Sequence, residues 1–231
     1  MLVAIHQPHY LPWLGYLHRM AQADLFIVLD HVQFERGNYQ NRTQVRVNGA
    51  AHWLTVPVLQ RSQKERLFEK TIDTTLDWAA THFETLRRAY GAAAAAPLER
   101  IFETPWERLV DLNATMLEFL RERFAISTPL VNSTDLDVDG AKSELVLNLC
   151  RAVGADALLV GLGASRHYLN RTAFAQAGVE LVLQQFNHPV YPQRGPAPFL
   201  AGLSALDLLF NCAAESQVLL HAKPEELSVA I

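Results

Sequence analysis

The chain has 231 residues, half of them hydrophobic, and a formal net charge of −4 from 24 acidic and 20 basic residues. A chain of this length and composition can bury a substantial core, which argues against disorder. The slight acidic excess, without any basic run, argues against a protein that grips nucleic acid by its charge. We therefore expect a folded protein whose partner is a small-molecule substrate.

Residues 1–30 predict a βαβ unit. An apolar strand over residues 2–6, a helix over 14–23 and a second buried strand over 25–30 follow one another. Continuous apolar strands that alternate with helices are typical of a parallel sheet with both faces covered. Such sheets bind ligands beside the carboxyl ends of their strands, so the residues that follow each strand become candidates for a site.

The next segment predicts a β-hairpin attached to this sheet. Two strand-like runs within residues 43–58 flank Asn48-Gly49, which is a strong signal for a tight hairpin turn. Residues 60–70 are polar and predict a loop.

From residue 76 to residue 124 the apolar spacing becomes helical. The low-complexity stretch 91–97 indicates a connection within this helical insert. Thr104-Pro105-Trp106-Glu107 has the residue order of a helix N-terminus, so we expect a helix from there to about Phe124.

The last third of the chain returns to alternating strands and helices. The expected elements are a helix from Asp139 or Gly140 to Val153, a strand at 157–160, a helix at 166–177, a strand at 179–186 and a terminal helix at 203–213, with a loose tail after Ser216. The whole chain, residues 1–231, therefore predicts a single α/β domain: a parallel Rossmann-like sheet with helices on both faces, an attached β-hairpin and a helical insert at about 76–124.

Two sets of residues could be given a functional interpretation, but their sequence context favours a structural role. Ser204 and Asp207 have the spacing of a helix N-cap and its capping-box partner. Cys150 and Cys212 both lie in apolar helical patterns, which favours two buried, reduced thiols over a disulfide or a zinc site. The start MLVAIHQP lacks the regions of a secretion signal, and no run of about 18 apolar residues occurs, so we expect a cytoplasmic protein without a membrane span.

Five polar clusters follow predicted strands or precede the hairpin, and the fold brings several of them to one edge. They are His6-Gln7-Pro8-His9-Tyr10, Asp30-His31-Val32-Gln33, Asn38-Tyr39-Gln40-Asn41-Arg42, residues 161–168 and residues 187–193. A lone histidine at a strand end is more often structural than catalytic. Since buried polar groups need hydrogen-bond partners, five such clusters are hard to assign to packing, and together they indicate a functional edge.

Several kinds of chemistry remain open at this edge. His6, His9, Asp30, His31 and His188 offer enough metal ligands, but His-x-x-His in a loop lacks the spacing of helical zinc motifs, so we assign no metal. The turn GLGASRH could receive a phosphate with help from Arg166, or could be only a tight turn between strand and helix. A nicotinamide fingerprint and a serine nucleophile elbow are absent, and the sequence names no cofactor.

The stretches IHQPHYLPWLGY, FIVLDHVQFERGNYQNR, WLTVPV, FNHPVYPQ and LSALDLLFN resemble the WbqC-like protein family, bacterial proteins associated with polysaccharide and O-antigen biosynthesis. This resemblance implies a sugar-modifying or acyl-transferring enzyme. A weaker similarity connects the start of the chain to the nucleotidyltransferase and pantothenate-synthetase-like fold, although Trp13 and Tyr16 stand where those proteins carry the two histidines of His-x-Gly-His. The loss of both histidines argues against adenylylation by the usual route.

We therefore expect a transferase that moves an acyl or aminoacyl group onto an amino sugar or a similar small amine, in polysaccharide or secondary-metabolite biosynthesis, with an acyl carrier as a candidate donor. His6 or His188 would be the general base, because only imidazole has an ordinary pKa near neutrality, and Asp30 would orient it or hold the ammonium form of the substrate. The predicted substrate-binding residues are Gln7, His9, Tyr10, Gln33, Asn41, Arg42, Ser165, Arg166, Tyr168, Tyr191 and Gln193. The alternatives are a non-catalytic module that binds a sugar nucleotide or carrier protein, and a nucleotide-dependent ligase.

Overall fold

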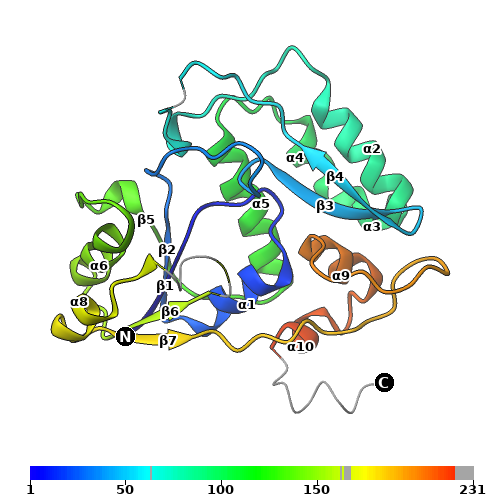
Figure 1. Ribbon diagram of the computed structural model, residues 1–231. Helices are drawn as coiled ribbons and strands as arrows, with labels where there is room; N and C mark the ends of the chain where they lie inside the picture. The colour runs from blue at the N-terminus through cyan, green and yellow to red at the C-terminus, as the bar shows by residue number, and fades with distance from the viewer. Residues whose placement is uncertain (63, 162, 164–167, 222–231) are drawn as a thin grey trace.

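A five-stranded parallel sheet lies at the centre of the protein (Figure 1). The computed structural model describes residues 1–62, 64–161, 163 and 168–221. All neighbouring strands of the sheet are parallel, so their carboxyl ends lie at one edge. In spatial order the strands are β5 (Leu130–Asn132), β2 (Leu25–Val28), β1 (Leu2–His6), β6 (Ala157–Val160) and β7 (Glu180–Leu183). The predicted α/β class is confirmed, and β5, which the sequence analysis missed, completes the sheet.

Helices cover both faces of the sheet, as predicted. One face carries α1 (Leu14–Gln22) and α5 (Leu109–Arg123), and the other carries α6 (Lys142–Ala152) and α8 (Arg171–Gln176) (Figure 1). The predicted helix at 166–177 is therefore observed from residue 171, and residues 166 and 167 lie outside the described residues.

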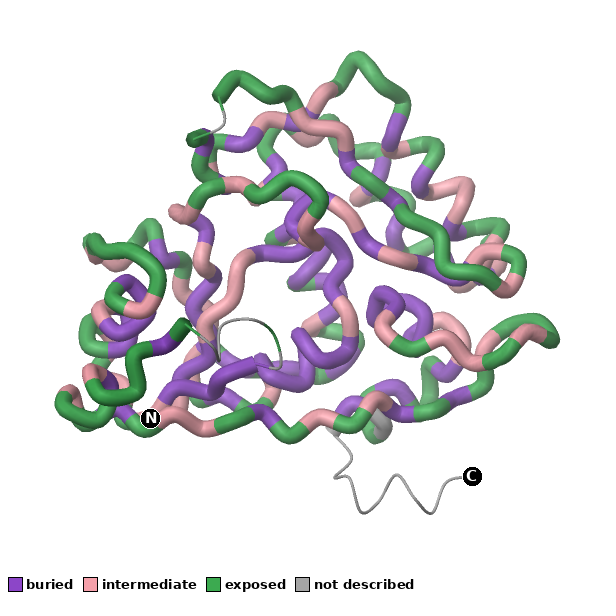
Figure 2. Tube along the Cα trace, viewed as in Figure 1, coloured by how far each residue is buried: buried purple, intermediate pink, exposed green. Residues whose placement is uncertain are grey.

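The alternation of side chains along the strands explains the two faces. Ala4 and Phe26 belong to the cluster with α1 and α5, whereas the neighbouring Val3 and Ile27 pack with α6. Successive residues of a strand point to opposite faces, so a strand covered on both sides must be apolar throughout. The central strands are accordingly mostly buried (Figure 2).

The hairpin forms a separate antiparallel sheet of β3 (Arg42–Val47) and β4 (Ala50–Thr55). Asn48 and Gly49 adopt φ values of 50° and 80°, as the predicted tight turn requires. The short helix η3 (Ser133–Asp135) directly follows β5. Beside the hairpin and at the end of the chain lie the short helix η1 (Leu67–Glu69) and the helices α2 (Trp78–Tyr90), α3 (Ala92–Ala95), η2 (Ala96–Leu98), α4 (Glu99–Glu103), α9 (Ala205–Asn211) and α10 (Ser216–His221). The last of these is a helix where a loose tail was expected.

The prediction that a helix begins at Thr104-Pro105-Trp106-Glu107 is wrong. α4 ends before this segment and α5 begins after it. The main chain of the segment pairs with residues 70–72 instead: Ile72 N donates to Glu107 O, and Leu109 N donates to Lys70 O. Backbone pairing with a distant segment therefore outweighs a local start signal.

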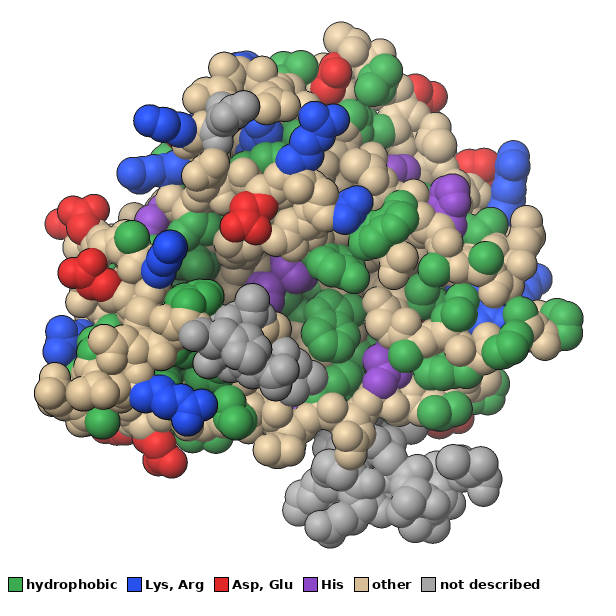
Figure 3. Space-filling model, viewed as in Figure 1, with side chains coloured by type: hydrophobic (Ala, Val, Ile, Leu, Met, Phe, Trp, Pro, Cys, Tyr) green, Lys and Arg blue, Asp and Glu red, His purple; other side chains and the backbone are tan. Residues whose placement is uncertain are grey.

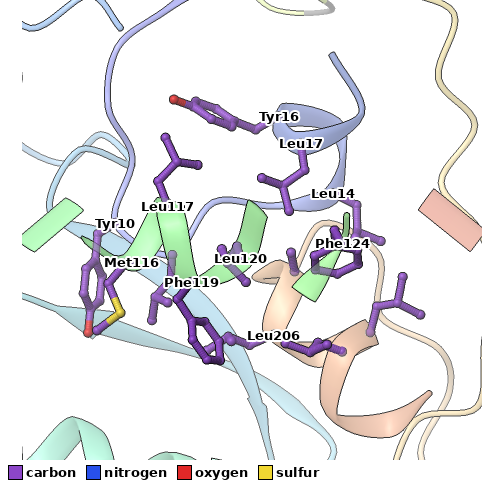
Figure 4. Packing of buried hydrophobic residues seen from close by; sticks show 14 of the residues in the cluster. Tyr10, Leu14, Tyr16, Leu17, Met116, Leu117, Phe119, Leu120, Phe124 and Leu206 are labelled. Atoms are coloured by element: carbon purple, nitrogen blue, oxygen red, sulfur yellow. The ribbon is translucent and has the colours of Figure 1, made fainter. Parts of the chain in front are cut away.

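The largest core cluster forms where α1, α5 and α9 meet (Figure 4). Leu14 and Leu17 from α1 pack with Leu120 from α5 and Leu206 from α9, and each is 0–1% exposed. Burying one such leucine side chain contributes about 1.5–3 kcal/mol. This packing fixes α1, and with it the side chains that α1 carries to the carboxyl edge of the sheet.

Within the described part of the chain, no helix has both the length and the apolar character needed to cross a membrane.

Candidate functional site

The strand order creates a topological switch beside β1. The chain leaves β1 through α1 toward β2, and returns on the opposite side of β1 through α6 and β6. In open α/β sheets, ligands bind in the crevice outside the carboxyl ends at such a point. The parallel pairing of β1 with β6 runs to Ala4 and Leu159, and His6 and Gly161 each follow two residues later along the chain. Figure 3 shows a hollow at the centre of this face with histidine side chains at its floor.

His6 ends β1 and enters the crevice as a half-buried side chain. Its Nδ1 lies 2.9 Å from the carbonyl oxygen of Gln7. Because a carbonyl oxygen only accepts hydrogen bonds, Nδ1 carries the proton in this contact. In the neutral ring Nε2 is then an acceptor, which is the form that a general base requires.

His6 belongs to a compact group of rings. Its centroid lies 4.5 Å from that of His9 and 4.8 Å from that of Tyr16, and His9 and Tyr16 are 5.1 Å apart. Tyr39 stacks on the other side of His9 at 5.5 Å. Edge-to-face and stacked contacts of this kind hold rings in fixed orientations, so the orientation of His6 is determined by its neighbours.

Two members of this group have buried polar atoms without a partner. Nδ1 of His9 and the hydroxyl of Tyr16 accept or donate no hydrogen bond among the described residues, although the side chains are only 6% and 1% exposed. Burial lowers the pKa of His9 to about 3 and raises that of Tyr16, so both are neutral at physiological pH. Buried polar atoms normally have partners, which indicates that a ligand or water completes the group.

Arg19, which the sequence analysis missed, is a third such residue. It lies one turn after Tyr16 on α1, is 6% exposed, and its Nε has no partner in the described ranges. Burial lowers its pKa to about 10, so the guanidinium still carries its charge at neutral pH. It packs against Gly161, where an added Cβ would lie 2.9 Å from its Cζ atom. The only sequence signal was the glycine itself, which marks a close approach without naming the residue that approaches.

Two pockets open at the same edge of the sheet. A pocket of about 390 Å³ is lined by His9, Asp30 and Asn113, and a larger one of about 900 Å³ by Gln7 and Tyr168. Phe68 and Thr134 line both pockets. The larger pocket also contains Gln33, Glu35, Asp137 and Asp139. A small molecule could therefore extend from the ring group in either direction.

Asp30 follows β2 and lies in the wall of the smaller pocket. Its Oδ1 accepts hydrogen bonds from Ser133 Oγ at 2.9 Å and Thr134 N at 3.0 Å, and its Oδ2 accepts one from Thr134 Oγ1 at 2.9 Å. His31 Nδ1 lies 2.6 Å from the same Ser133 hydroxyl. The carboxylate therefore joins the ends of β2 and β5, and the imidazole that it was expected to orient is not among these contacts.

His188 belongs to a second group of rings. Its ring contacts are with Phe186, Tyr191 and Phe199, whereas those of His6 are with His9 and Tyr16. Nδ1 of His188 donates to Pro189 O at 2.9 Å, and burial lowers the pKa of the ring. The two candidate bases are thus placed in separate groups, and we assign the working crevice to His6.

Tyr191 and Gln193 serve a buried carboxylate. Asp207 Oδ2 accepts hydrogen bonds from Tyr191 Oη at 2.9 Å and Gln193 Nε2 at 2.7 Å, and Oδ1 accepts one from Tyr90 Oη at 2.9 Å. Ser204 caps α9 as predicted by accepting from Leu206 N. Asp207 therefore has a structural role, as expected, but it acts by accepting these three hydrogen bonds and not as a capping-box partner of Ser204.

The remaining predicted residues are spread over the protein. Tyr10 is fully buried, and its hydroxyl lies 3.0 Å from His82 Nδ1. Asn41 donates to Val56 O at 2.8 Å, and Arg42 stacks on Trp53 and donates to Gly37 O. Tyr10 therefore serves the core, while Asn41, Arg42 and Gln33 line a third pocket of about 810 Å³. Ser165 and Arg166 lie outside the described residues.

Thiolate and metal chemistry find little support in the described ranges. Cys150 and Cys212 are unpaired and buried, as predicted, and burial raises the pKa of both thiols, that of Cys150 to about 12. Within the same ranges, no cluster of three or more His, Cys, Asp or Glu side chains has a metal-binding arrangement.

Comparison with known proteins agrees with the motifs quoted above. The profile of the WbqC-like protein family matches residues 7–218. The chain belongs to the WbqC-like protein family. It is 31% identical over 223 residues to a protein of Mycobacterium tuberculosis (strain ATCC 25618 / H37Rv) named "Uncharacterized protein Rv1507c", covering 93% of this chain and 95% of that protein. No solved structure matches the chain.

Proposed function

We propose that this WbqC-like protein is a transferase that moves an acyl or aminoacyl group onto a small amine, such as an amino sugar, at the crevice between β1 and β6. The observation that carries the proposal is the position of His6: it ends β1 at the topological switch, and because its Nδ1 is occupied by Gln7 O, its Nε2 is left as an acceptor. An imidazole in this form is suited to accept a proton from an attacking nucleophile.

The chemistry of such a step balances with the residues at hand. The amine nitrogen forms a bond to the acyl carbon as it loses a proton to His6 Nε2. The bond from the acyl carbon to the donor's leaving group breaks, and the leaving group departs with the electron pair and then receives the proton from His6.

The charge of the larger pocket supports an amine as the acceptor. Glu35, Asp137 and Asp139 line this pocket together with Gln7, whose carbonyl oxygen contacts His6 Nδ1. Carboxylates stabilise the ammonium form of an amine by charge. The same pocket contains Arg66 and Lys142, which suit the anionic part of a sugar nucleotide or an acyl carrier.

The proposal is tested in two stages. Amino-sugar nucleotides and simple amines are first screened by thermal shift, because a specific ligand raises the melting temperature by mass action. Ligands that bind are then incubated with acyl thioesters, aminoacyl donors and acylated carrier protein, and products are sought by mass spectrometry. Binding without any product would favour the non-catalytic module instead.

The variant His6→Ala tests whether His6 is the general base. We expect it to lower turnover about 10²–10⁴-fold while leaving the melting temperature close to that of the wild type. His52→Ala is the matched control, because His52 is exposed on the hairpin. Wild-type turnover in His6→Ala would show that His6 is not the base.

A further inference from the structure

We propose that Arg19 and Tyr16 form a subsite for an oxyanion, a phosphate or a carboxylate group of the ligand, between α1 and the end of β6. The inference rests on the proposed function, because the ligand that would carry this anion is the substrate that reacts at His6 in the same crevice. It adds a recognition element on α1, a helix on which the sequence analysis predicted no site residue.

The first argument is the missing counter-charge of Arg19. A buried charge is stable only when it is paired and hydrogen-bonded. Arg46 follows this rule: it is 4% exposed and donates to Gln193 Oε1, Pro198 O and Ala197 O at 2.6–2.8 Å. Arg19 is 6% exposed, and its guanidinium has no ion pair or hydrogen bond with any described residue.

The second argument is the position of the guanidinium. It packs against the backbone of Gly161, immediately after the last residue of β6. This is the carboxyl edge of the sheet at the topological switch, where ligands of open α/β sheets bind. A planar guanidinium offers a fork of donors that matches the oxygens of a phosphate or carboxylate. The cation therefore lies where such a group would arrive.

The third argument is the neighbouring hydroxyl. Tyr16 precedes Arg19 by three residues, so both side chains lie on the same side of α1. The ring of Tyr16 borders the buried core, whereas its hydroxyl points away from Leu14, Leu17 and Phe124 (Figure 4). This hydroxyl has no partner among the described residues and is a phenol, which can donate to an anion. Two unpartnered donors from one helix face thus converge on one crevice.

The subsite would hold the ligand in a fixed position relative to His6, the proposed base. The ring centroids of His6 and Tyr16 lie 4.8 Å apart, and Arg19 follows Tyr16 by three residues on α1. An anion held by Arg19 would place the rest of the ligand against Nε2 of His6. The two residues therefore divide the work, with Arg19 positioning the ligand and His6 moving the proton.

The test measures melting temperature in sodium phosphate, pyrophosphate, acetate and succinate, with sodium chloride at matched ionic strength. We expect at least one oxyanion to raise the melting temperature of the wild type by about 2–4 °C over chloride. Arg19→Met should abolish this rise, whereas Arg151→Met, a change at an exposed arginine on α6, should preserve it. Phosphates active without carboxylates would identify a phosphorylated ligand, and the reverse would identify a carboxylate.

Two further variants keep the test decisive if Arg19→Met does not fold. Arg19→Lys keeps the charge but loses the fork, and Gly161→Ala displaces the guanidinium, so each should reduce the rise. Absence of an oxyanion effect in the wild type, or its persistence in the Arg19 variants, would overturn the subsite. His6→Ala should retain the effect, so a failure of the base would be distinguished from a failure of the subsite.

Discussion

The guanidinium of Arg19 fills the space that a side chain at position 161 would occupy. The contact requires glycine at position 161 because any Cβ atom there would collide with the guanidinium. The backbone conformation does not require glycine, since φ of Gly161 is not positive. Helix α1 and the segment that follows β6 therefore depend on each other at the crevice. This dependence can be measured as a coupling energy between the two positions.

We predict that Gly161→Ala lowers the free energy of unfolding by about 1–3 kcal/mol through overpacking against Arg19. In an Arg19→Ala background the same change should have little effect, because the space is then free. Gly163→Ala is the control, since an added Cβ there would have no described atom within 4 Å. Urea unfolding of Gly161→Ala, Arg19→Ala and the double variant, compared with the wild type, measures the coupling energy. An equal loss of stability from Gly161→Ala in the wild-type and Arg19→Ala backgrounds would contradict the coupling.

Asp207→Asn should be strongly destabilising. The carboxylate is fully buried and accepts hydrogen bonds from Tyr90, Tyr191 and Gln193. An asparagine amide has a single accepting oxygen, so at least one buried donor would lose its partner. We expect a loss of about 2–4 kcal/mol in the free energy of unfolding, compared with about 1 kcal/mol for Tyr191→Phe. Equal stability of Asp207→Asn and the wild type would refute this role.

Breaking the buried ion pair between Lys70 and Glu65 should cost more stability than breaking the exposed pair between Arg88 and Glu84. Lys70 Nζ lies 2.7 Å from Glu65 Oε2, and the side chains are 2% and 8% exposed. Lys70→Met leaves a buried carboxylate without its partner, so we expect a loss of about 3–5 kcal/mol. Arg88→Met breaks an exposed pair with Glu84 at the same 2.7 Å and should change stability little. Similar denaturation midpoints for the two variants would count against this assignment.

Stability should fall as the pH drops below about 6.5. Burial lowers the pKa of His9 to about 3 and that of His82 to about 4, so the folded protein keeps both rings neutral while the unfolded chain takes up protons near its ordinary pKa of 6.5. Between pH 6 and about 4, each histidine therefore reduces stability by about 1.4 kcal/mol per pH unit. His82→Gln should flatten this slope, and His52→Gln, at an exposed position, should not. An unchanged slope in His82→Gln would exclude the mechanism.

The central architecture could be predicted because its signals are local. Residues 2–6 and 25–30 are continuous apolar runs on either side of a helix, and this pattern has few interpretations other than a parallel βαβ unit. Asn48-Gly49 specifies a hairpin through two residues that tolerate positive φ. β5, with only three residues after Pro129, is too short to give a periodic pattern.

The parts that could not be predicted depend on contacts between distant segments. Thr104-Pro105 carries a valid helix-start signal, but the main chain that follows, at Glu107 and Leu109, pairs with residues 70–72. Arg19 lies in an amphipathic helix and looks like a solvent-facing residue until Gly161 is brought against it. His188 and His6 both follow strands, and only the structure assigns them to different ring groups.

The melting temperature of ligand-free Arg19→Met, compared with that of the wild type, tests most directly whether the crevice is built for a ligand. If Arg19 is an unpaired charge kept for binding, its replacement by an apolar side chain of similar length should raise the melting temperature by about 2–4 °C. If Arg19 instead stabilises the fold, the same replacement should lower the melting temperature, and that result would contradict the account.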